Sequence, residues 1–297
     1  MLRVSGVLGL LMLTGAAHAD GKGAIRWLVD GEVGLFSDSN LSRAERERDR
    51  IADEGALVSA GVVMRLVPSF KTALNLRAFA ETEHLATASS LARTSFGGQA
   101  IFRGQTRLGF TAPVYQVIAT VQQDDYAVDQ RDSTVTTLQG LVQRRFNSSI
   151  TFNAGVEVQQ RKSDGTVFDN EQARVFGNID YAVGEHLSLY GVYSFTSGDT
   201  FSSAQLVFCN GTPATDIFGL ISAAQALEPD EAFNTDFCGS WIAYKLGATT
   251  QSLLFGANYG FNHNLSADIS VQQVEVSADG GNQYERTIIR AGLLGRF

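Results

Sequence analysis

Apolar and polar residues alternate with a period of two through most of the chain, and this pattern constrains the fold more than any other feature. The stretch 150–161 shows it best, with Ile150, Phe152, Ala154, Val156 and Val158 separating Thr151, Asn153, Glu157, Gln159 and Arg161. Because successive side chains of a β-strand point to opposite faces, such a segment has one apolar and one polar face. The last segment, 290–297, alternates as well and ends in Phe297. We therefore expect a protein made mainly of amphipathic strands.

Twelve segments carry the pattern and are expected to be strands: 24–36, 57–66, 70–81, 93–108, 114–126, 133–146, 150–161, 172–183, 187–197, 250–261, 265–276 and 284–297. Short turns alternate with longer polar loops, which cover 37–54, 82–92, 127–132, 162–171, 198–249 and 277–283. An even number of strands, with both termini on the short-turn side, is the layout of single-chain bacterial barrels. Residues 241–246 could form one more strand, which leaves the strand count open in that region.

The first residues look like an export signal. Arg3, an apolar run over 7–13 and the sequence Ala17-His18-Ala19 predict a signal peptide over 1–19, cleaved after Ala19. Residues 20–297 are then the mature barrel domain. No later window holds eighteen uncharged apolar residues, so no transmembrane helix is expected.

An exported, alternating chain that ends in Phe297 resembles the porin-like outer-membrane β-barrel proteins of Gram-negative bacteria. The resemblance implies an all-β fold: a transmembrane antiparallel up-and-down barrel of about 12 strands, in the outer membrane, with periplasmic termini. It implies contact with outer-membrane lipid and lipopolysaccharide, and with the barrel-assembly machinery through the last strand. A soluble β-sandwich is disfavoured, because its core would need bulkier inward side chains. The formal charge of −8 argues against nucleic acid as a partner.

The expected inward faces carry many charged residues, and arginine dominates. The pore-lining candidates are Arg26, Arg65, Lys71, Arg77, Arg103, Arg107, Arg145, Arg161, Arg174, Arg286 and Arg290, with the acids Asp30, Glu32, Asp124, Glu157 and Asp180. Two interpretations stand side by side. Excess positive charge in a narrow lumen would favour anions. Alternatively, the same groups form salt bridges that fill a small barrel, since twelve strands enclose a lumen of intermediate width.

The long loop 198–249 contains both cysteines, Cys209 and Cys238. In an exported chain two cysteines predict one disulfide, and neither these cysteines nor any other group suggests a metal or a cofactor. Between them, residues 216–227 predict a helix, with Asp216 as its N-cap and an apolar stripe on one face. The stripe must be buried, either as a lid that restricts the barrel mouth or in a self-packed surface loop stapled by the disulfide.

Two loop segments and one histidine are further candidates for a functional site. The loop sequence at 37–40 predicts an Asx turn rather than a calcium site, and residues 43–50 are interpreted as a solvated hairpin loop that a partner or lipopolysaccharide could use. His84 lies near Ser89 and Ser90, but proximity in a loop is no catalytic geometry. We expect no enzyme. The leading hypothesis is an outer-membrane channel for small hydrophilic solutes with a preference for anions. The alternative is a non-conducting scaffold whose outer loops bind another, unidentified surface protein.

Overall fold

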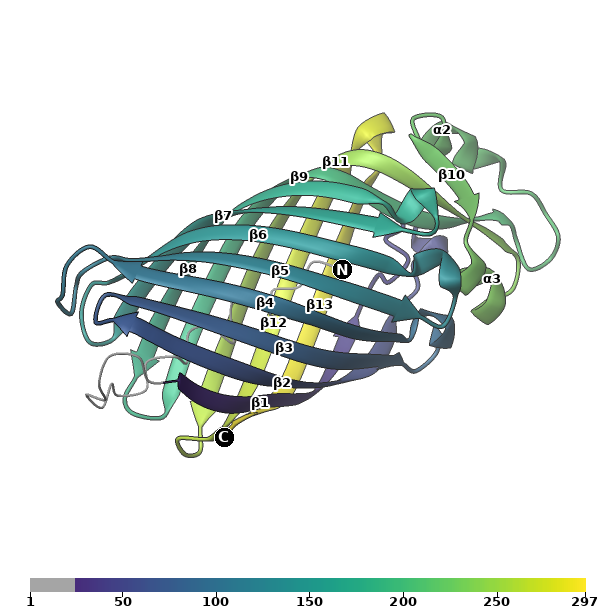
Figure 1. Cartoon of the computed structure of the whole chain (residues 1–297). Coiled ribbons are helices and arrows are strands. Elements are labelled where there is room, and N and C mark those ends of the chain that lie inside the picture. Colours follow the sequence, from purple (N-terminus) through teal and green to yellow (C-terminus); the bar gives the residue numbers. More distant parts are fainter. Residues whose placement is uncertain (1–24) are drawn as a thin grey trace.

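Each long strand pairs antiparallel with the next one along the chain, and the last pairs with the first. The computed structural model describes residues 25–297, in which twelve strands close into a barrel (Figure 1). These strands are β1 (Ile25–Asp38), β2 (Asp53–Ser69), β3 (Thr72–Leu85), β4 (Arg93–Gln105), β5 (Val114–Tyr126), β6 (Ser133–Arg145), β7 (Ile150–Ser163), β8 (Asn170–Val183), β9 (Leu187–Val207), β11 (Ser240–Gly260), β12 (Leu265–Ala278) and β13 (Gln283–Arg296). The predicted fold class is confirmed. The predicted signal peptide, residues 1–19, lies outside the described residues.

The two ends of the barrel differ. One end, called the turn end, carries the short connections and both described termini, because the backbone N–H of Val29 donates to the carbonyl of Phe297. The other end, called the loop end, carries short 3-10 turns and small elements: η1 (Glu47–Asp49), η2 (Ser89–Leu91), η3 (Asp129–Arg131), η4 (Thr166–Phe168), η5 (Thr215–Ile217), α2 (Phe218–Ile221), β10 (Ala226–Pro229), α3 (Glu231–Asp236) and η6 (Asp279–Gly281).

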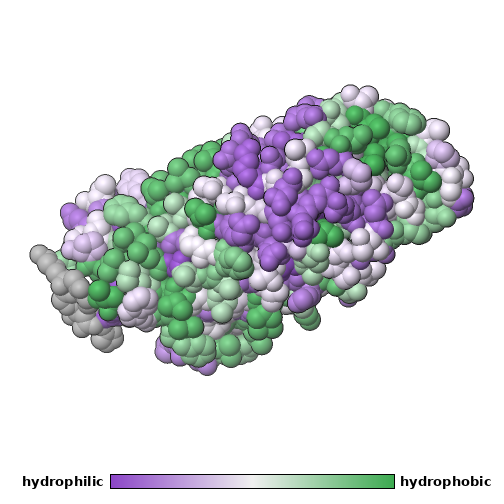
Figure 2. Space-filling view, turned by 45° about the vertical axis from the view of Figure 1, so that its right-hand side comes forward, coloured by the Kyte–Doolittle hydropathy of each residue, from purple (hydrophilic) through white to green (hydrophobic). Residues whose placement is uncertain are grey.

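The alternation of side chains follows the prediction. In β7, Asn153 and Arg161 are buried inside the barrel, whereas Phe152 and Val156 are exposed on its outer face. The outer face is apolar mainly toward the turn end, where Trp27, Val33, Val58, Val62, Phe102, Val117, Val156, Ile179, Phe255, Ile269 and Leu293 are exposed. Toward the loop end the same face is polar, with exposed Glu54, Gln123, Asp125, Gln160, Lys162, Glu171, Glu275 and Glu285. Figure 2 shows this change, from green areas toward the turn end at the left to a purple region farther along the barrel. An outward apolar band is typical of barrels that span a membrane.

Three predicted boundaries are wrong. Strands β9 and β11 are each 21 residues long, so the interruption expected over 198–249 shrinks to 208–239, and residues 241–246 belong to β11. The predicted helix over 216–227 is limited to η5 and α2, Asp216 caps nothing with its side chain, and Leu227 lies in β10. The connection after β4 occupies 106–113, longer than the expected tight turn, so Arg107 lies outside the strands.

The extra length of β9 and β11 forms a cap over the loop end. The cap comprises residues 201–246: the paired ends of β9 and β11, β10 along the free edge of β11, and the two short helices (Figure 1). The predicted disulfide is confirmed, with the Cα atoms of Cys209 and Cys238 5.1 Å apart at the tip of this hairpin. Inside the cap, Trp241 is 1% exposed and Tyr244 is 0% exposed.

The cap is packed against the loops of the barrel on all sides. Three apolar clusters hold the cap. In the first, Trp241 and Phe233 pack with Leu41, Leu85 and Leu91. In the second, Tyr244 packs with Ile217 and Leu246, and in the third, Ala243 packs with Val167 and Phe168 of η4. Apolar contacts therefore cover both faces of the β9–β11 extension. Burial of these apolar side chains stabilises the cap as an ordered part of the fold.

Candidate functional site

A chamber of about 1060 Å³ lies inside the barrel beneath the cap. It reaches the turn end, where Ser148, His186 and His263 of three connecting turns line it. At the loop end it stops below a buried hydrogen bond between the hydroxyls of Thr200 and Tyr284, 3.0 Å apart. Among the described residues, none between 201 and 246 lines it. The chamber therefore ends below the cap, and the short helix α2 does not enter it.

The predicted inward residues fall into groups with different environments. Nine of them line the chamber: Arg26, Arg65, Arg77, Arg145, Arg286, Arg290, Asp30, Glu32 and Asp180. Four others form ion pairs: Arg161, Arg174 and Asp124, which are buried, and Glu157, which is half-buried. Arg103 faces a small side recess of about 80 Å³, which Arg145 also lines. Lys71 lies at the turn end, donating to the carbonyl of Thr106, and Arg107 lies in the neighbouring connection, so neither is a lumen residue of a strand.

Part of the lumen is filled by a buried charge network, as one of the two sequence interpretations proposed. The Arg93 guanidinium lies 2.7 Å from a Glu83 carboxylate oxygen and 3.7 Å from one of Asp124. Asp124 also lies 3.0 Å from Arg161, and Ser95 donates a hydrogen bond to it. Buried charges persist only when they are paired and hydrogen-bonded, and this group meets that condition. It fills the lumen along the loop-end portions of β3, β4, β5 and β7, and the chamber continues along the same side toward the turn end, where Gln99, Arg145 and Thr151 line it.

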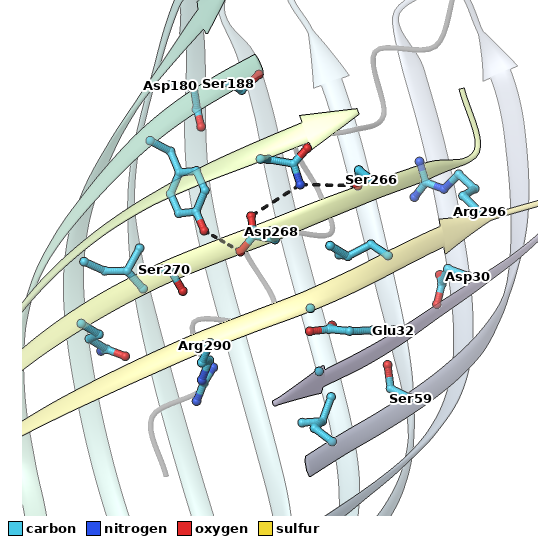
Figure 3. Close-up of a pocket in the computed structure, with 18 of the residues that line it drawn as sticks. Asp30, Glu32, Ser59, Asp180, Ser188, Ser266, Asp268, Ser270, Arg290 and Arg296 are labelled. Atoms are coloured by element: carbon cyan, nitrogen blue, oxygen red, sulfur yellow. Dashed lines mark hydrogen bonds between the residues drawn. The ribbon is translucent and has the colours of Figure 1, made fainter. Parts of the chain in front are cut away.

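The chamber wall carries charges of both signs. On the β8–β12 side, Asp268 accepts a hydrogen bond from the hydroxyl of Tyr190 at 2.8 Å, and Asn258 lies between Asp268 and Ser266 (Figure 3). On the opposite side the Arg77 guanidinium holds Asp30 at 2.6 Å. In total, eight arginines and seven carboxylates line the chamber, so its net charge is close to neutral. A preference for anions cannot come from net charge and requires a local concentration of arginine.

Arg43 forms part of the roof, and its backbone is unusual. Its φ of 57° lies in the left-handed region, which a residue other than glycine seldom adopts. The guanidinium lies 4.0 Å from the ring centre of Phe201 and lines the chamber. Burial lowers the pKa of Arg43 to about 10, so the side chain still carries its charge at neutral pH. The sequence gives no signal for this residue, because side-chain alternation does not extend into loops.

The loop 43–50 is not the solvated hairpin that the sequence suggested. Arg46 and Arg48 bind the Asp216 carboxylate of the cap at 3.1 Å and 2.6 Å. The hydrogen bond from Arg48 lowers the pKa of Asp216. Burial beneath the cap raises the pKa of Asp49, whose carboxylate accepts from the backbone N–H of Gln205. The loop 43–50 therefore anchors the cap through these ion pairs and this hydrogen bond, and we call such a set of contacts a fastening. The Asx turn predicted before it is confirmed, since the backbone N–H of Asn40 donates to Asp38.

A second fastening lies at the centre of the cap. Asp230 is fully buried and accepts from the Arg131 guanidinium of η3 at 2.7 Å and from the Ser203 hydroxyl. The same guanidinium lies within 6 Å of three aromatic rings, those of Phe168, Phe201 and Phe233. Cation–π contacts of this kind strengthen when water is excluded. Arg131 therefore joins the third loop, the fourth loop and the cap into one unit.

Neither a catalytic pair nor a metal site emerges from the described residues. Ser89 and Ser90 donate to Asp236 of the cap, whereas His84 faces outward and contacts Thr82. Within residues 25–297, no group of three or more His, Cys, Asp or Glu side chains is placed to hold a metal ion. No helix in the same range is long and apolar enough to cross a membrane.

Among solved structures, the chain is similar to outer-membrane β-barrels. The COG4313 outer membrane channel from Pseudomonas putida F1 aligns with a TM-score of 0.55 and 12% identity, over 94% of this chain and 97% of that chain. The KdgM porin in complex with disordered oligogalacturonate aligns with a TM-score of 0.42 and 9% identity, over 91% and 99%. The translocator domain of the autotransporter NalP from Neisseria meningitidis gives 0.42 and 9%, over 94% and 90%. No family model and no curated protein matches the sequence. At this level of identity the first likeness shows the fold.

Proposed function

We propose that the protein is an outer-membrane channel for small hydrophilic solutes, closed by its cap in the state described. The observation that carries this proposal is the chamber of about 1060 Å³, which extends from the turn end to the roof between polar walls. A space of this size is at the upper end of the range for small-molecule sites. The apolar band outside and the polar lumen inside fit a barrel that lies in a bilayer and admits water.

The orientation follows from the same features. Both described termini lie at the turn end, which would face the periplasm, and the capped loop end would face the outside. The expected signal peptide over 1–19 would direct the chain to this route, and the last strand, ending in Phe297, would engage the barrel-assembly machinery. The outer apolar band would contact lipid, and the polar collar toward the loop end would contact lipopolysaccharide.

Passage of a solute requires movement of the cap. Solutes that enter the chamber from the turn end meet the roof formed by Arg43, Thr200 and Tyr284. The fastenings at Asp216 and Asp230 are the contacts that must break or shift before the chamber can connect with the outside. Lids that move on a slow timescale gate many proteins in this way. Planar-bilayer recording is the test: the channel proposal expects brief or infrequent openings in the wild type and frequent openings when the cap is weakened.

The second candidate function is a non-conducting scaffold that binds another protein through the cap. The observation that favours it is the cap itself, which is well packed yet exposes two apolar side chains at its surface, Phe218 at 57% and Leu227 at 50%. Exposed apolar side chains on an ordered surface can serve as an interaction site. Bilayers that stay closed at every voltage, for the wild type and for cap variants alike, would favour this function over the channel.

A further inference from the structure

The side recess beside the chamber concentrates positive charge. Arg103 of β4 and Arg145 of β6 both line it, together with Gln105, Gln143 and Phe110, and no carboxylate is among its lining residues. Phe110 and Arg145 also line the chamber, so the recess lies directly beside the space through which a solute would pass.

A third arginine adds to the same charge. The charges of Arg65 of β2 and of Arg145 both act on Arg103, and like charges repel one another. Within residues 25–297, neither Arg65, Arg103 nor Arg145 forms a salt bridge, and the buried Nε of Arg65 has no hydrogen-bond partner. This differs from the loop-end portions of β4 and β7, where Arg93 and Arg161 are paired with carboxylates. Three partly enclosed guanidiniums without a counter-charge cost free energy unless an anion joins them.

The shape of the recess limits the size of that anion. The connection 106–113 folds back toward the lumen and places Phe110 beside the Arg145 guanidinium, with 5.5 Å between the guanidinium carbon and the ring centre. A ring over the guanidinium leaves the N–H groups at its edge for a ligand, and carboxylates and phosphates can accept two parallel hydrogen bonds from that edge. At about 30 Å³ per water molecule, a space of about 80 Å³ holds two or three waters or one small anionic group.

We propose that this recess is a binding site for a phosphate-sized oxyanion or a carboxylate group, held by Arg103 and Arg145 with Arg65 nearby. This proposal rests on the proposed channel function: the solutes that pass through the chamber would carry a phosphate or carboxylate group. A preference for anions would then come from the recess alone, because the charges that line the chamber nearly cancel.

Calorimetric titration of the detergent-solubilised full chain with inorganic phosphate, and separately with acetate, tests the site without requiring transport. The wild type is expected to bind one or both, and the tighter of the two identifies the class of anion. Arg103→Gln and Arg145→Gln should each weaken binding at least tenfold, about the loss of one charge-assisted hydrogen bond. Arg144→Gln is the matched control. It removes the same charge from the adjacent residue, which lies on the outer face beside Phe146, and should leave binding unchanged.

A measurement on the wild type guards against variants that fail to fold. Phenylglyoxal labels accessible arginines, and the anion that binds should protect Arg103 and Arg145 from it while Arg144 is labelled as before. Absence of binding by both anions, or equal loss in the Arg144 variant, would overturn the site. Conductance without anion binding would refute the site and leave the channel standing. Anion binding in a protein that never conducts would refute the channel and leave the site standing.

Discussion

At the scale of single residues, the most consequential contact is the buried pair of Asp230 and Arg131. Replacing Asp230 with alanine leaves the Arg131 guanidinium buried among three aromatic rings without its counter-charge. Removing one partner of a buried ion pair costs about 3–5 kcal/mol. We expect Asp230→Ala to detach the cap while the barrel stays folded. Limited proteolysis should then cut within 201–246 much faster than in the wild type.

The control for this variant is its neighbour. Glu231 follows Asp230 at the start of α3, and its side chain is exposed. Glu231→Gln should therefore leave the rate of cleavage unchanged. A cap that resists protease equally in the Asp230 and Glu231 variants would show that the buried pair does not hold it.

Asp216 gives a pH-dependent prediction. Its pKa is lowered by the hydrogen bond from Arg48, so the fastening is complete at neutral pH and is lost as the pH falls through this lowered value, below the ordinary 3.8. We expect Asp216→Asn to raise the opening frequency at pH 7 by less than about fivefold, because exposed ion pairs contribute at most about 1 kcal/mol. In bilayer recordings, the difference between this variant and the wild type should shrink as the pH is lowered further below 3.8. A difference that stays constant while the pH falls through the acid range would contradict the assignment.

The sequence predicted which strand residues face the lumen but not what they meet there. Alternation alone places Arg161 and Arg65 on the inner face, and both lie there. It cannot reveal that Arg161 is neutralised by Asp124 from a strand two positions away, whereas Arg65 forms no salt bridge with any of the residues 25–297. Pairing across a barrel depends on strand register and tilt, which a single sequence does not contain. Loop residues such as Arg43 and Phe110 carry no period at all, and their inward positions could not be predicted.

At the scale of elements, the β9–β11 hairpin matters most, because its extra length turns a loop into a cap. The sequence over 216–227 has a helical apolar stripe, yet only α2 is α-helical, since Ile217 is drawn into the cluster around Tyr244 and Leu227 pairs with Tyr244 in β10 and β11. Tertiary packing has overridden local propensity here. The extension of β9 and β11 was not predicted, because 200–203 and 247–250 consist of small or polar residues apart from Phe201 and resemble a loop in composition.

The disulfide closes the tip of this hairpin and lies far from the barrel wall. Reduction, or the double change Cys209→Ser and Cys238→Ser, should loosen residues 210–237 by removing a cross-link that contributes on the order of 3 kcal/mol. The barrel should keep its heat-modifiable gel mobility, because its closure depends on strand pairing. Hydrogen exchange should rise in the segment between the cysteines and stay unchanged in β1 to β8. Loss of the folded gel band on reduction would contradict this separation of cap and barrel.

At the scale of the whole molecule, the architecture assigns separate roles to separate parts. The apolar outer band and the closed ring of strands fit a barrel in a membrane. The buried charge network narrows the lumen toward the loop end of β3 to β7, and the chamber extends from there to the turn end. The cap crosses the loop end and is joined to the first, second, third and fourth loops by polar contacts, and to the last by the hydrogen bond from Asn282 to Tyr244. The chamber therefore reaches the turn end and is covered by the cap at the loop end.

The measurement that tests this account most directly is conductance of a variant without the cap. Deleting residues 202–244 and joining Phe201 to Lys245 through an Asn-Gly turn keeps the two strands paired, since these residues are already partners in the ladder. The heat-modifiable gel shift confirms that the variant is folded. In planar bilayers the account predicts a stable conductance several-fold above that of the wild type at every voltage. A folded variant that stays as closed as the wild type would contradict it, because the chamber would then not be the path of a channel.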